Sequence, residues 1–386
     1  MWFGQPFSTR VLRSFFASGA ANLGTGLITL PPWFAITCAT TGRTSQVSAS
    51  SLVTGLGANA ARARNVGSGT GLSVENAGTN YLTYSVDLAG ADWQAGAMAT
   101  STGNADPAGG TQARGFTSTG SQYGDYNQKP NVQGPASMRT HSGWCRGVTG
   151  SSPYAHWRGT TAGPSSYVDV TSTTWSRLSI TEAADVPVGQ GKMQANFETR
   201  ANEPTGAPAI SGTTSMYGYS WQHESIVLYP SSYIPTTSAA ASRAADVVAV
   251  ATPANVAPGG FFDLDLLVAP NYADTEQAAD HNLVYFDTNN RIFIQKTTKK
   301  IVLRIGGADV LSSALTWSRE APLRIHAMHR AGGRKLDVAG ATSGNGSSGL
   351  QSAASAISLP ATSYLMGSNT GAEECGDLRH LMILMP

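Results

Sequence analysis

Short apolar segments separated by turn residues run along the whole chain, and long helical periodicity is almost absent. The clearest segment spans residues 261–268, where apolar residues alternate with carboxylates in the order Phe262, Asp263, Leu264, Asp265 and Leu266. Successive side chains of a strand point to opposite faces, so this segment predicts a strand with one apolar face and one acidic face.

The last third of the chain predicts a series of such strands, which are Val247–Val250, residues 261–268, Leu283–Phe286, Arg291–Gln295, Ile301–Ile305, Leu323–Ala327, Arg334–Val338 and Leu378–Leu384. An Asn-rich turn at residues 288–290 joins two of them as a hairpin. The middle third adds weaker strands at Tyr167–Val170, Trp175–Ile180 and Ser225–Tyr229, and we expect loops over residues 101–121 and 146–166. Short strands at nearly regular spacing predict antiparallel β-sandwiches.

Charge is scarce in this chain of 386 residues. Asp, Glu, Lys and Arg make up 13% of it, about half of the usual share, and the formal net charge is +1. Because neither sign is in excess, broad electrostatic attraction to nucleic acid is excluded. A hydrophobic content of 41% is too high for a disordered chain, and no apolar run approaches the roughly 18 residues of a membrane span. Such a composition favours a packed assembly, and we expect a homo-oligomer.

The first 42 residues carry an aromatic series with few charges. An apolar run that follows two arginines is interrupted by Ser18 and Gly19, so we expect a retained segment rather than a cleaved signal peptide. Aromatic side chains left in water are an aggregation liability, so we interpret residues 1–42 as an extended arm that docks on other subunits. The docking candidates are Trp2, Phe3, Phe7, Phe15, Phe16 and Trp33. The alternative is that this segment folds back onto its own domain.

The titratable residues form no metal-binding or catalytic pattern. His326 and His329 are three apart on a predicted strand and therefore face opposite sides, so they cannot share a metal ion. Asp263 and Asp265 share a face, but one strand provides only part of a calcium shell, so we expect a solvated outer face.

Other chemical motifs are missing from the sequence. The three cysteines form no CxxC pair, and we expect reduced or buried thiols at Cys38, Cys145 and Cys375. The Gly-rich stretch 55–71 lacks the strand-then-helix context of a phosphate-binding loop, and no Gly-x-Ser-x-Gly elbow is present. We therefore expect a protein that is not an enzyme and that uses no cofactor and no metal.

Sugar recognition is the remaining candidate chemistry. Pyranose rings stack on aromatic side chains while polar groups bind their hydroxyls, and residues 123–158 supply such a mixture. The glycan-binding candidates are Tyr123, Tyr126, Trp144, Tyr154, Trp157 and Arg158. Packing of this group against a neighbouring subunit is an equal alternative, and internal packing is a third. Trp175 lies in a predicted strand and is assigned to the core.

Three stretches resemble an arrangement found in bacteriophage tail and virion appendage proteins. The first is RAR at residues 62–64 with GLSVENAGTNYL at 71–82, and the second is WQHE at 221–224 with SYIPTT at 232–237 and RAAD at 243–246. The third, Gly367–Leu381, resembles the last strands of a laminin-G or concanavalin-like sandwich, and Thr174–Arg177 resembles a strand of carbohydrate-binding jelly rolls. The first stretch departs from the family pattern at Ser73 and Asn76.

The resemblance implies an all-β chain with two antiparallel β-sandwich (jelly-roll) domains in tandem after the N-terminal arm. The segments are the docking arm 1–42, a lead-in segment 43–85 that packs on the first sandwich, a carbohydrate-binding-module-like jelly roll 86–235 and a laminin-G-like or concanavalin-like sandwich 236–386. The implied function is a non-enzymatic virion structural protein, a tail fibre, tail-tip or capsid decoration protein on the virion surface. It would be assembled in the host cytoplasm, anchored to capsid or tail proteins by its arm, and would bind host-surface polysaccharide. The alternatives are a glycan depolymerase of a phage particle and a secreted bacterial lectin.

Overall fold

A computed structural model describes the chain in many segments. The described residues are 12–15, 21–22, 27–28, 34–39, 43–48, 50–66, 69–95, 98–119, 124–128, 139–149, 154–157, 166–170, 172–182, 194–197, 213–225, 229–250, 257–352, 355–368 and 376–384.

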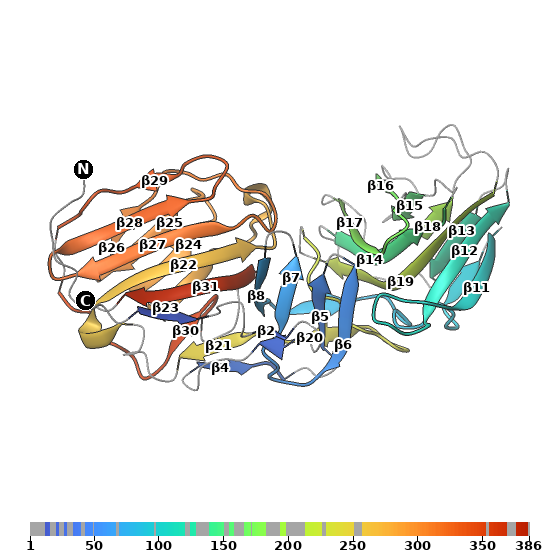
Figure 1. The fold of residues 1–386 in the computed structure, drawn as a ribbon, viewed down its shortest axis with the longest axis horizontal. Helices are drawn as coiled ribbons and strands as arrows, with labels where there is room; N and C mark the ends of the chain where they lie inside the picture. The colour runs from blue at the N-terminus through green and yellow to red at the C-terminus, as the bar shows by residue number, and fades with distance from the viewer. Residues whose placement is uncertain are drawn as a thin grey trace. The chain divides into compact units, whose positions relative to one another are not determined.

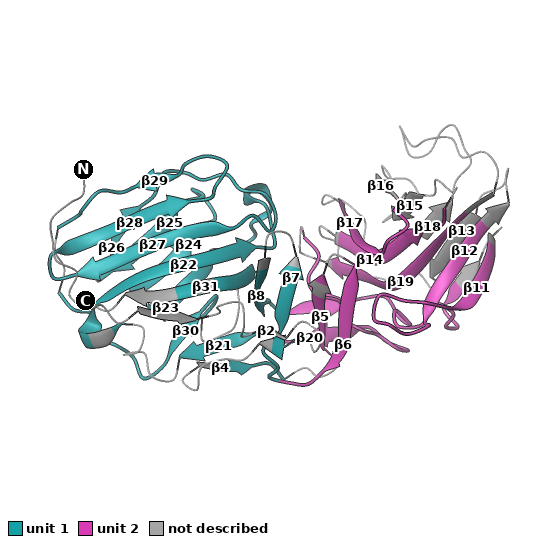
Figure 2. Ribbon diagram, viewed as in Figure 1, with its two compact units in different colours: residues 1–39, 59–76, 245–386 teal, residues 40–58, 77–244 magenta. Residues whose placement is uncertain are grey.

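Antiparallel strands make up nearly all of the regular structure (Figure 1). The helices of the described residues are two short 3-10 turns, η2 (Pro258–Gly260) and η3 (Asp274–Glu276). In the part of the chain that is described, no helix has the length and apolar character needed to cross a membrane. The predicted all-β fold is confirmed. The chain divides into two compact units, coloured teal and magenta in Figure 2, and each is assembled from segments that are separate in the sequence.

Unit 1 comprises residues 1–39, 59–76 and 245–386. Its larger sheet has the order β29 (Gly346–Ser347), β28 (Gly333–Ala339), β27 (Leu323–Arg330), β22 (Phe262–Pro270), β31 (Gly376–Leu384), β8 (Gly69–Val74) and β7 (Ala63–Val66), with β1 (Leu12–Phe15) paired to β31. Its second sheet has the order β26 (Ala308–Leu311), β25 (Ile301–Ile305), β24 (Asn290–Ile294), β23 (His281–Asp287), β30 (Ser363–Leu365), β21 (Val247–Val250) and β4 (Phe34–Thr37). A small hairpin joins β2 (Ala21–Asn22) to β3 (Leu27–Ile28).

The two sheets of unit 1 pack face to face through their buried residues. In β27, the fully buried Leu323, Ile325 and Ala327 alternate with three residues that are at least partly exposed, which are Arg324, His326 and Met328. Phe262 of the larger sheet stacks on Phe286 of the second sheet, with ring centroids 5.9 Å apart. Every strand predicted between Val247 and Leu384 is present, with bounds shifted by a few residues. The period-two pattern therefore located this sandwich correctly.

Two pieces of the predicted arm are strands of unit 1. β1 pairs with the last strand, β31, and β4 pairs with β21 at the edge of the second sheet. These pairings correct the expectation of an extended arm: the segments fold back onto their own domain, because their backbone groups find hydrogen-bond partners along existing strands. Deleting residues 1–42 would remove a strand from each of the two sheets.

The domain boundaries also differ from those expected. Residues 59–76, which were assigned to the lead-in segment, supply β7 and β8 of unit 1, and the later boundary falls after Ala244 rather than after residue 235. The two sandwiches are therefore not in simple tandem. Unit 2, residues 40–58 and 77–244, is inserted between segments of unit 1.

Unit 2 contains a five-stranded sheet in the order β11 (Met98–Asn104), β12 (Ala113–Thr119), β19 (Thr213–Ser225), β14 (Arg139–Gly147) and β17 (Ser176–Glu182). A three-stranded sheet has the order β10 (Trp93–Ala95), β13 (Gly124–Gln128) and β18 (Gln194–Phe197). The remaining pairs are β15 (Tyr154–Trp157) with β16 (Ser166–Asp169), β20 (Ala241–Arg243) with β9 (Gly78–Asn80), and β5 (Arg43–Ser48) with β6 (Ser51–Leu56).

Both faces of the five-stranded sheet are covered by apolar side chains. Cys145 of β14 belongs to one buried cluster, where Trp221 stacks on Phe116 with ring centroids 5.5 Å apart. Its neighbour Trp144 points to the other face and belongs to a second cluster, which includes Tyr233. Consecutive residues of one strand are thus buried on opposite sides, as expected for a central strand that is covered on both faces.

Two expected loops contain strands. β11 and β12 occupy most of residues 101–121, and β15 lies within residues 146–166. β11 and β12 are rich in Ser, Thr and Gly, so they carry little apolar alternation, and β12 is held by pairing with β11 on one side and β19 on the other. Backbone pairing, rather than side-chain pattern, defines these strands.

Candidate functional site

The predicted glycan-binding residues lie mostly beyond what the structure describes. Tyr126 lies in β13, and Tyr154 and Trp157 lie in β15, but the description covers only the strand positions of these three residues. Tyr123 and Arg158 fall outside the described residues. Their role as glycan contacts stays a prediction.

The prediction that Trp144 contacts a glycan is wrong. It lies in β14, paired with β19 and β17, and its side chain is 0% exposed. A pyranose ring cannot stack on an indole that is buried in the core, so Trp144 is not a glycan contact. Trp175 is 8% exposed in the same cluster and confirms its assignment to the core.

Most of the predicted docking residues also lie outside the part of the chain that the structure describes. Trp2, Phe3, Phe7, Phe16 and Trp33 lie outside the described residues. Phe15 ends β1, where the description covers its pairing with Leu381 and not its side chain.

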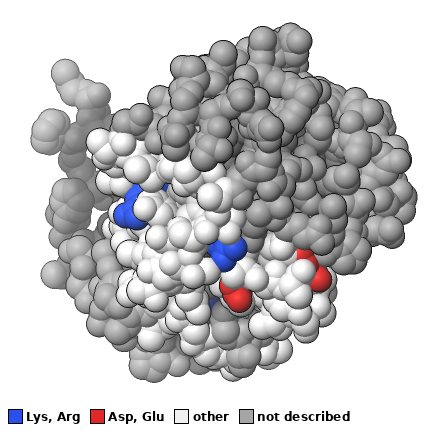
Figure 3. Space-filling view, turned by 90° about the vertical axis from the view of Figure 1, so that its right-hand side faces the viewer, with Lys and Arg blue, Asp and Glu red and all other residues white. Residues whose placement is uncertain are grey.

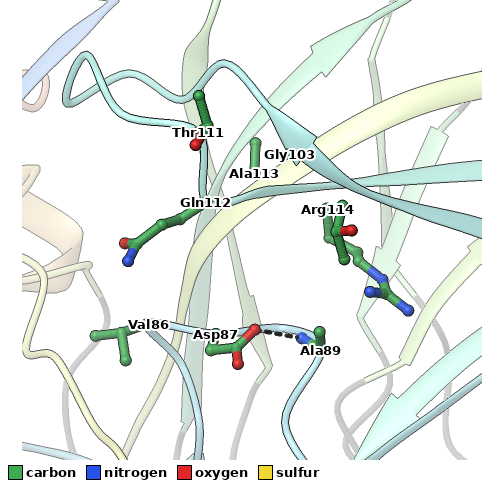
Figure 4. A pocket seen from close by; sticks show the side chains of 9 residues that line it. Val86, Asp87, Ala89, Gly103, Thr111, Gln112, Ala113 and Arg114 are labelled. Atoms are coloured by element: carbon green, nitrogen blue, oxygen red, sulfur yellow. Dashed lines mark hydrogen bonds between the residues drawn. The ribbon is translucent and has the colours of Figure 1, made fainter.

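A pocket of about 280 Å³ lies in unit 2 between residues 86–89 and the ends of β11 and β12 with the turn that joins them (Figure 4). The side chains of Thr111, Gln112 and Arg114 lie opposite Val86 and Asp87 in this view. The complete lining is Val86, Asp87, Ala89, Thr102, Gly103, Thr111, Gln112, Ala113 and Arg114. Its volume is close to the lower end, about 300 Å³, of the usual range for ligand pockets.

The buried carboxylate of Asp106 fixes the turn that leads to Thr111 and Gln112, which line this pocket. Its Oδ1 accepts hydrogen bonds from the backbone N–H groups of Ala108 and Gly110, both at 2.9 Å, and its Oδ2 accepts one from Gln112 at 2.9 Å. The residue type suits this role, because an Asp side chain imitates a backbone acceptor in turns. The turn therefore presents Thr111 and Gln112 in a defined orientation.

The polar groups of the pocket include both donors and acceptors. Asp87 accepts a 2.8 Å hydrogen bond from the N–H of Ala89 through Oδ1, which leaves Oδ2 for another donor. Arg114 donates from Nη2 to the hydroxyl of Thr100 at 2.6 Å, which orients its guanidinium. Among the described residues, the lining contains no aromatic side chain, so these residues suit a ligand that is recognised by its hydroxyl groups rather than by ring stacking.

The sequence carries a signal for this site in the turn that joins β11 to β12. Asp106 is followed by Pro107 and, after Ala108, by two glycines, a turn signature that joins two strands. The prediction of a loop over residues 101–121 hides this turn, so the glycan-binding candidates predicted from the sequence do not include its residues.

Several residues of the motifs that carry the family resemblance form buried ion pairs and hydrogen bonds. In unit 1, Nη2 of Arg62 lies 2.8 Å from both Oε2 of Glu75 and Oδ2 of Asp246, and all three side chains are buried. Burial alone would lower the pKa of Arg62, but the two carboxylates raise it above its ordinary value. Asp246 also accepts the N–H of Glu75 at 3.0 Å.

A second buried network lies in unit 2. Nδ2 of Asn80 donates to the carbonyl of Ile234 at 2.8 Å, and its Oδ1 accepts the N–H of His223 at 3.0 Å. Oε1 and Oε2 of Glu224 accept hydrogen bonds from the hydroxyl and the N–H of Ser231. Burial raises the pKa of Glu224, against the opposing effects of Ser231 and Arg243. These hydrogen bonds connect strand ends in the interior of unit 2.

The acidic outer face predicted for β22 is present, but it is ion-paired rather than solvated. Asp263 and Asp265 are 3% and 7% exposed and bond to basic side chains of β27. His326 and His329 face opposite sides, as predicted, because His326 is partly exposed beside Asp263 whereas His329 is buried. Among the residues with a described position, no group of three or more His, Cys, Asp or Glu side chains is arranged to hold a metal ion.

The surface agrees with the low charge of the sequence. On the face shown in Figure 3, the described surface is mostly uncharged, with a few separate Lys or Arg and Asp or Glu groups. Such a face offers hydrogen-bonding groups without a strong field of either sign.

Comparison with known proteins does not assign the chain to a family. No protein-family model matches it, and no curated protein matches it significantly in sequence. Among solved structures it is similar to the N-terminal tandem of two CBM22 domains from Paenibacillus barcinonensis Xyn10C. That similarity has 12% sequence identity and a TM-score of 0.29, and it covers 81% of this chain and 100% of that one.

Proposed function

We propose that this chain is a non-enzymatic saccharide-binding protein, displayed on a bacteriophage particle, that binds a neutral glycan in the pocket of unit 2. The observation that carries the saccharide part is the pocket between the Asp106 turn and residues 86–89. A sugar presents several hydroxyl groups that both donate and accept, and this pocket offers a carboxylate, a guanidinium, an amide and hydroxyls together. Its small volume fits one sugar residue at the end or branch of a chain.

The virion part of the proposal rests on the sequence resemblance. The motif residues lie in buried polar contacts such as Arg62 with Asp246, which supports their role as determinants of the architecture rather than of the ligand. Trp2, Phe3 and Phe7, which precede β1, would contact the particle, and further copies would pack against the uncharged faces of the chain. Electron microscopy of the virion with an antibody against unit 2 tests the location. Labelling confined to the host cell and absent from particles would refute it.

Saccharide binding is tested by titration calorimetry with the full chain and neutral hexasaccharides of glucose, xylose and mannose. We expect binding of at least one, and a loss of about tenfold or more in affinity for the double variant Thr111→Val and Gln112→Ala, which removes two hydrogen-bonding groups. Thr54→Val is the matched control, because Thr54 is also exposed in unit 2 but does not line the pocket. Equal weakening by Thr54→Val would contradict the assignment of the site.

A reducing-sugar assay on the same hexasaccharides separates binding from turnover. A non-enzymatic protein releases no new reducing ends over a day of incubation. Release of reducing ends that scales with protein concentration would favour the depolymerase alternative.

A further inference from the structure

A second pocket, of about 350 Å³, lies on the outer face of the larger sheet of unit 1. It is lined by Asp265 of β22, by Arg324 and His326 of β27, and by Asp337, Val338 and Ala339 of β28. The pocket is therefore built on three adjacent strands rather than on loops, which gives its side chains fixed positions.

The register of these strands places acidic and basic side chains alternately in one row across the sheet. Asp265 lies opposite His326, which in turn lies opposite Asp337. His326 bonds to Asp337 of this row through Nδ1 at 3.2 Å. Through Nε2 it bonds at 2.5 Å to Asp263, which lies two residues before Asp265 on β22. Arg324 bonds to Asp265 through Nε and Nη2. These contacts hold each polar side chain before any ligand arrives.

Every basic group around this pocket already has a carboxylate partner. Arg330 is paired with Asp263, Lys335 with Asp337 and Arg324 with Asp265. An anionic ligand would therefore have to compete with a carboxylate that is already in place. A neutral ligand with hydroxyl groups could instead bind to the unused hydrogen-bonding positions of the same side chains.

Three side chains of the lining remain accessible, and Arg324 is the most exposed of them. The side chains of Arg324, His326 and Asp337 are 64%, 32% and 28% exposed, whereas the side chain of Asp265 is 9% exposed. Among the described residues, Nη1 of Arg324 has no hydrogen-bond partner, so its two N–H groups can donate to a ligand. Arg324 lies opposite Ala339, two residues along β28 from Asp337, so the guanidinium and the carboxylate are diagonal neighbours.

We propose that this pocket is a second saccharide-binding site, in which the two N–H groups on Nη1 of Arg324 donate to hydroxyl groups of a neutral sugar. Ala339, whose side chain lies on the same face of β28 as Asp337, supplies apolar lining for the C–H face of the ring. The inference shares its ligand class with the function proposed above, but it concerns a different unit and different residues. A chain with two separate sites would gain affinity for a long polysaccharide by binding it at two points.

The test uses the full chain carrying Thr111→Val and Gln112→Ala, so that the pocket in unit 2 is disabled. This protein is titrated with the neutral hexasaccharides of glucose, xylose and mannose and with hexagalacturonate as an acidic probe. We expect millimolar binding of at least one neutral probe, and an affinity lowered about tenfold or more by Arg324→Met. Ala339→Tyr, which fills the pocket without changing a charge, should have the same effect.

Arg304→Met is the matched control. Arg304 also bonds to a carboxylate with two nitrogens, Nε and Nη2 to Asp309, but it lies on β25 of the second sheet, outside the pocket. Its removal should leave the affinity within about twofold. Absence of binding by all neutral probes, preference for hexagalacturonate, or equal effects of Arg304→Met and Arg324→Met would each overturn the second site. None of these outcomes touches the first pocket, whose variants are measured separately in the otherwise unchanged chain.

Discussion

Arg62 and Asp246 form a buried ion pair between residues 184 positions apart in the sequence, with Nη2 and Oδ2 separated by 2.8 Å. Glu75 completes the arrangement on the same nitrogen of Arg62. Two stretches that resemble phage appendage proteins thus meet at one buried point of unit 1. The pair links the start of β7 to the start of the C-terminal segment, which begins just before β21, and Glu75 adds the end of β8 to the same point.

Replacing Arg62 by Met should destabilise unit 1 by about 3–5 kcal/mol, because the variant removes the guanidinium that bridges two buried carboxylates. Denaturant unfolding followed by circular dichroism measures this loss. Arg304→Met is the control, since it breaks a partly exposed pair and should cost at most about 1 kcal/mol. Similar losses for both variants would contradict the prediction that the buried ion pair of Arg62 stabilises the fold more than the partly exposed pair of Arg304.

Gly143 allows Trp221 to lie against β14. A Cβ atom at residue 143 would overlap the indole ring of Trp221, which is 0% exposed and cannot move into solvent. Gly143→Ala should therefore destabilise unit 2 by about 1–3 kcal/mol. Gly57→Ala, in the same unit, has no neighbour within 4 Å of the added atom and should change stability by less than about 0.5 kcal/mol. The two free energies of unfolding are measured in urea, and equal values would contradict the packing argument.

His326 makes the stability of unit 1 depend on pH above neutrality. The hydrogen bond to Asp263 is the main cause that raises the pKa of His326, with Asp337 adding to it and burial opposing it. A raised pKa in the folded state means that its contribution is fully present below the unfolded value of about 6.5 and is lost as pH rises through the folded value. The free energy of unfolding should therefore decrease from pH 6.5 to 9. In His326→Gln this slope should be absent, and a slope that survives the substitution must come from another group.

Cys145 should resist alkylation in the native protein. Burial raises the pKa of its thiol to about 12, against a smaller opposing effect of Trp221, so the thiol is protonated at pH 7.5 as well as inaccessible. Peptide mass spectrometry after iodoacetamide treatment should find Cys145 unmodified without denaturant and modified in 8 M urea. Modification at the rate of an exposed thiol in the native state would contradict its place in the core.

The sequence pattern predicts strands well where one face is apolar and the other polar. In β22 the alternation of Leu264 and Leu266 with Asp263 and Asp265 predicts both the strand and its two faces. The hairpin of β23 and β24 is also predicted, because its Asn-rich turn interrupts two apolar runs. In these strands the local signal and the burial in the fold agree.

The sequence pattern does not reveal strands that are buried on both faces, because their apolar and polar residues do not alternate. Trp144 and Cys145 are adjacent and both buried, so no period of two is visible, and the Gly and Ser residues around them indicate a loop. The pocket of unit 2 could not be assembled either, because its two sides come from residues 86–89 and 102–114, which only the fold brings together. The balanced charges around His326 are likewise a result of register between three strands.

The pairing of the first strand with the last has a consequence for how the chain folds during its synthesis. All strands of unit 2 lie before residue 245, so this unit can complete its sheets while the ribosome is still translating. Unit 1 cannot, because β31 connects β22 to both β1 and β8 and is the last strand to emerge. The N-terminal strands must therefore wait through most of translation with their edges open, and the unit forms as a whole only after residue 384 has left the exit tunnel.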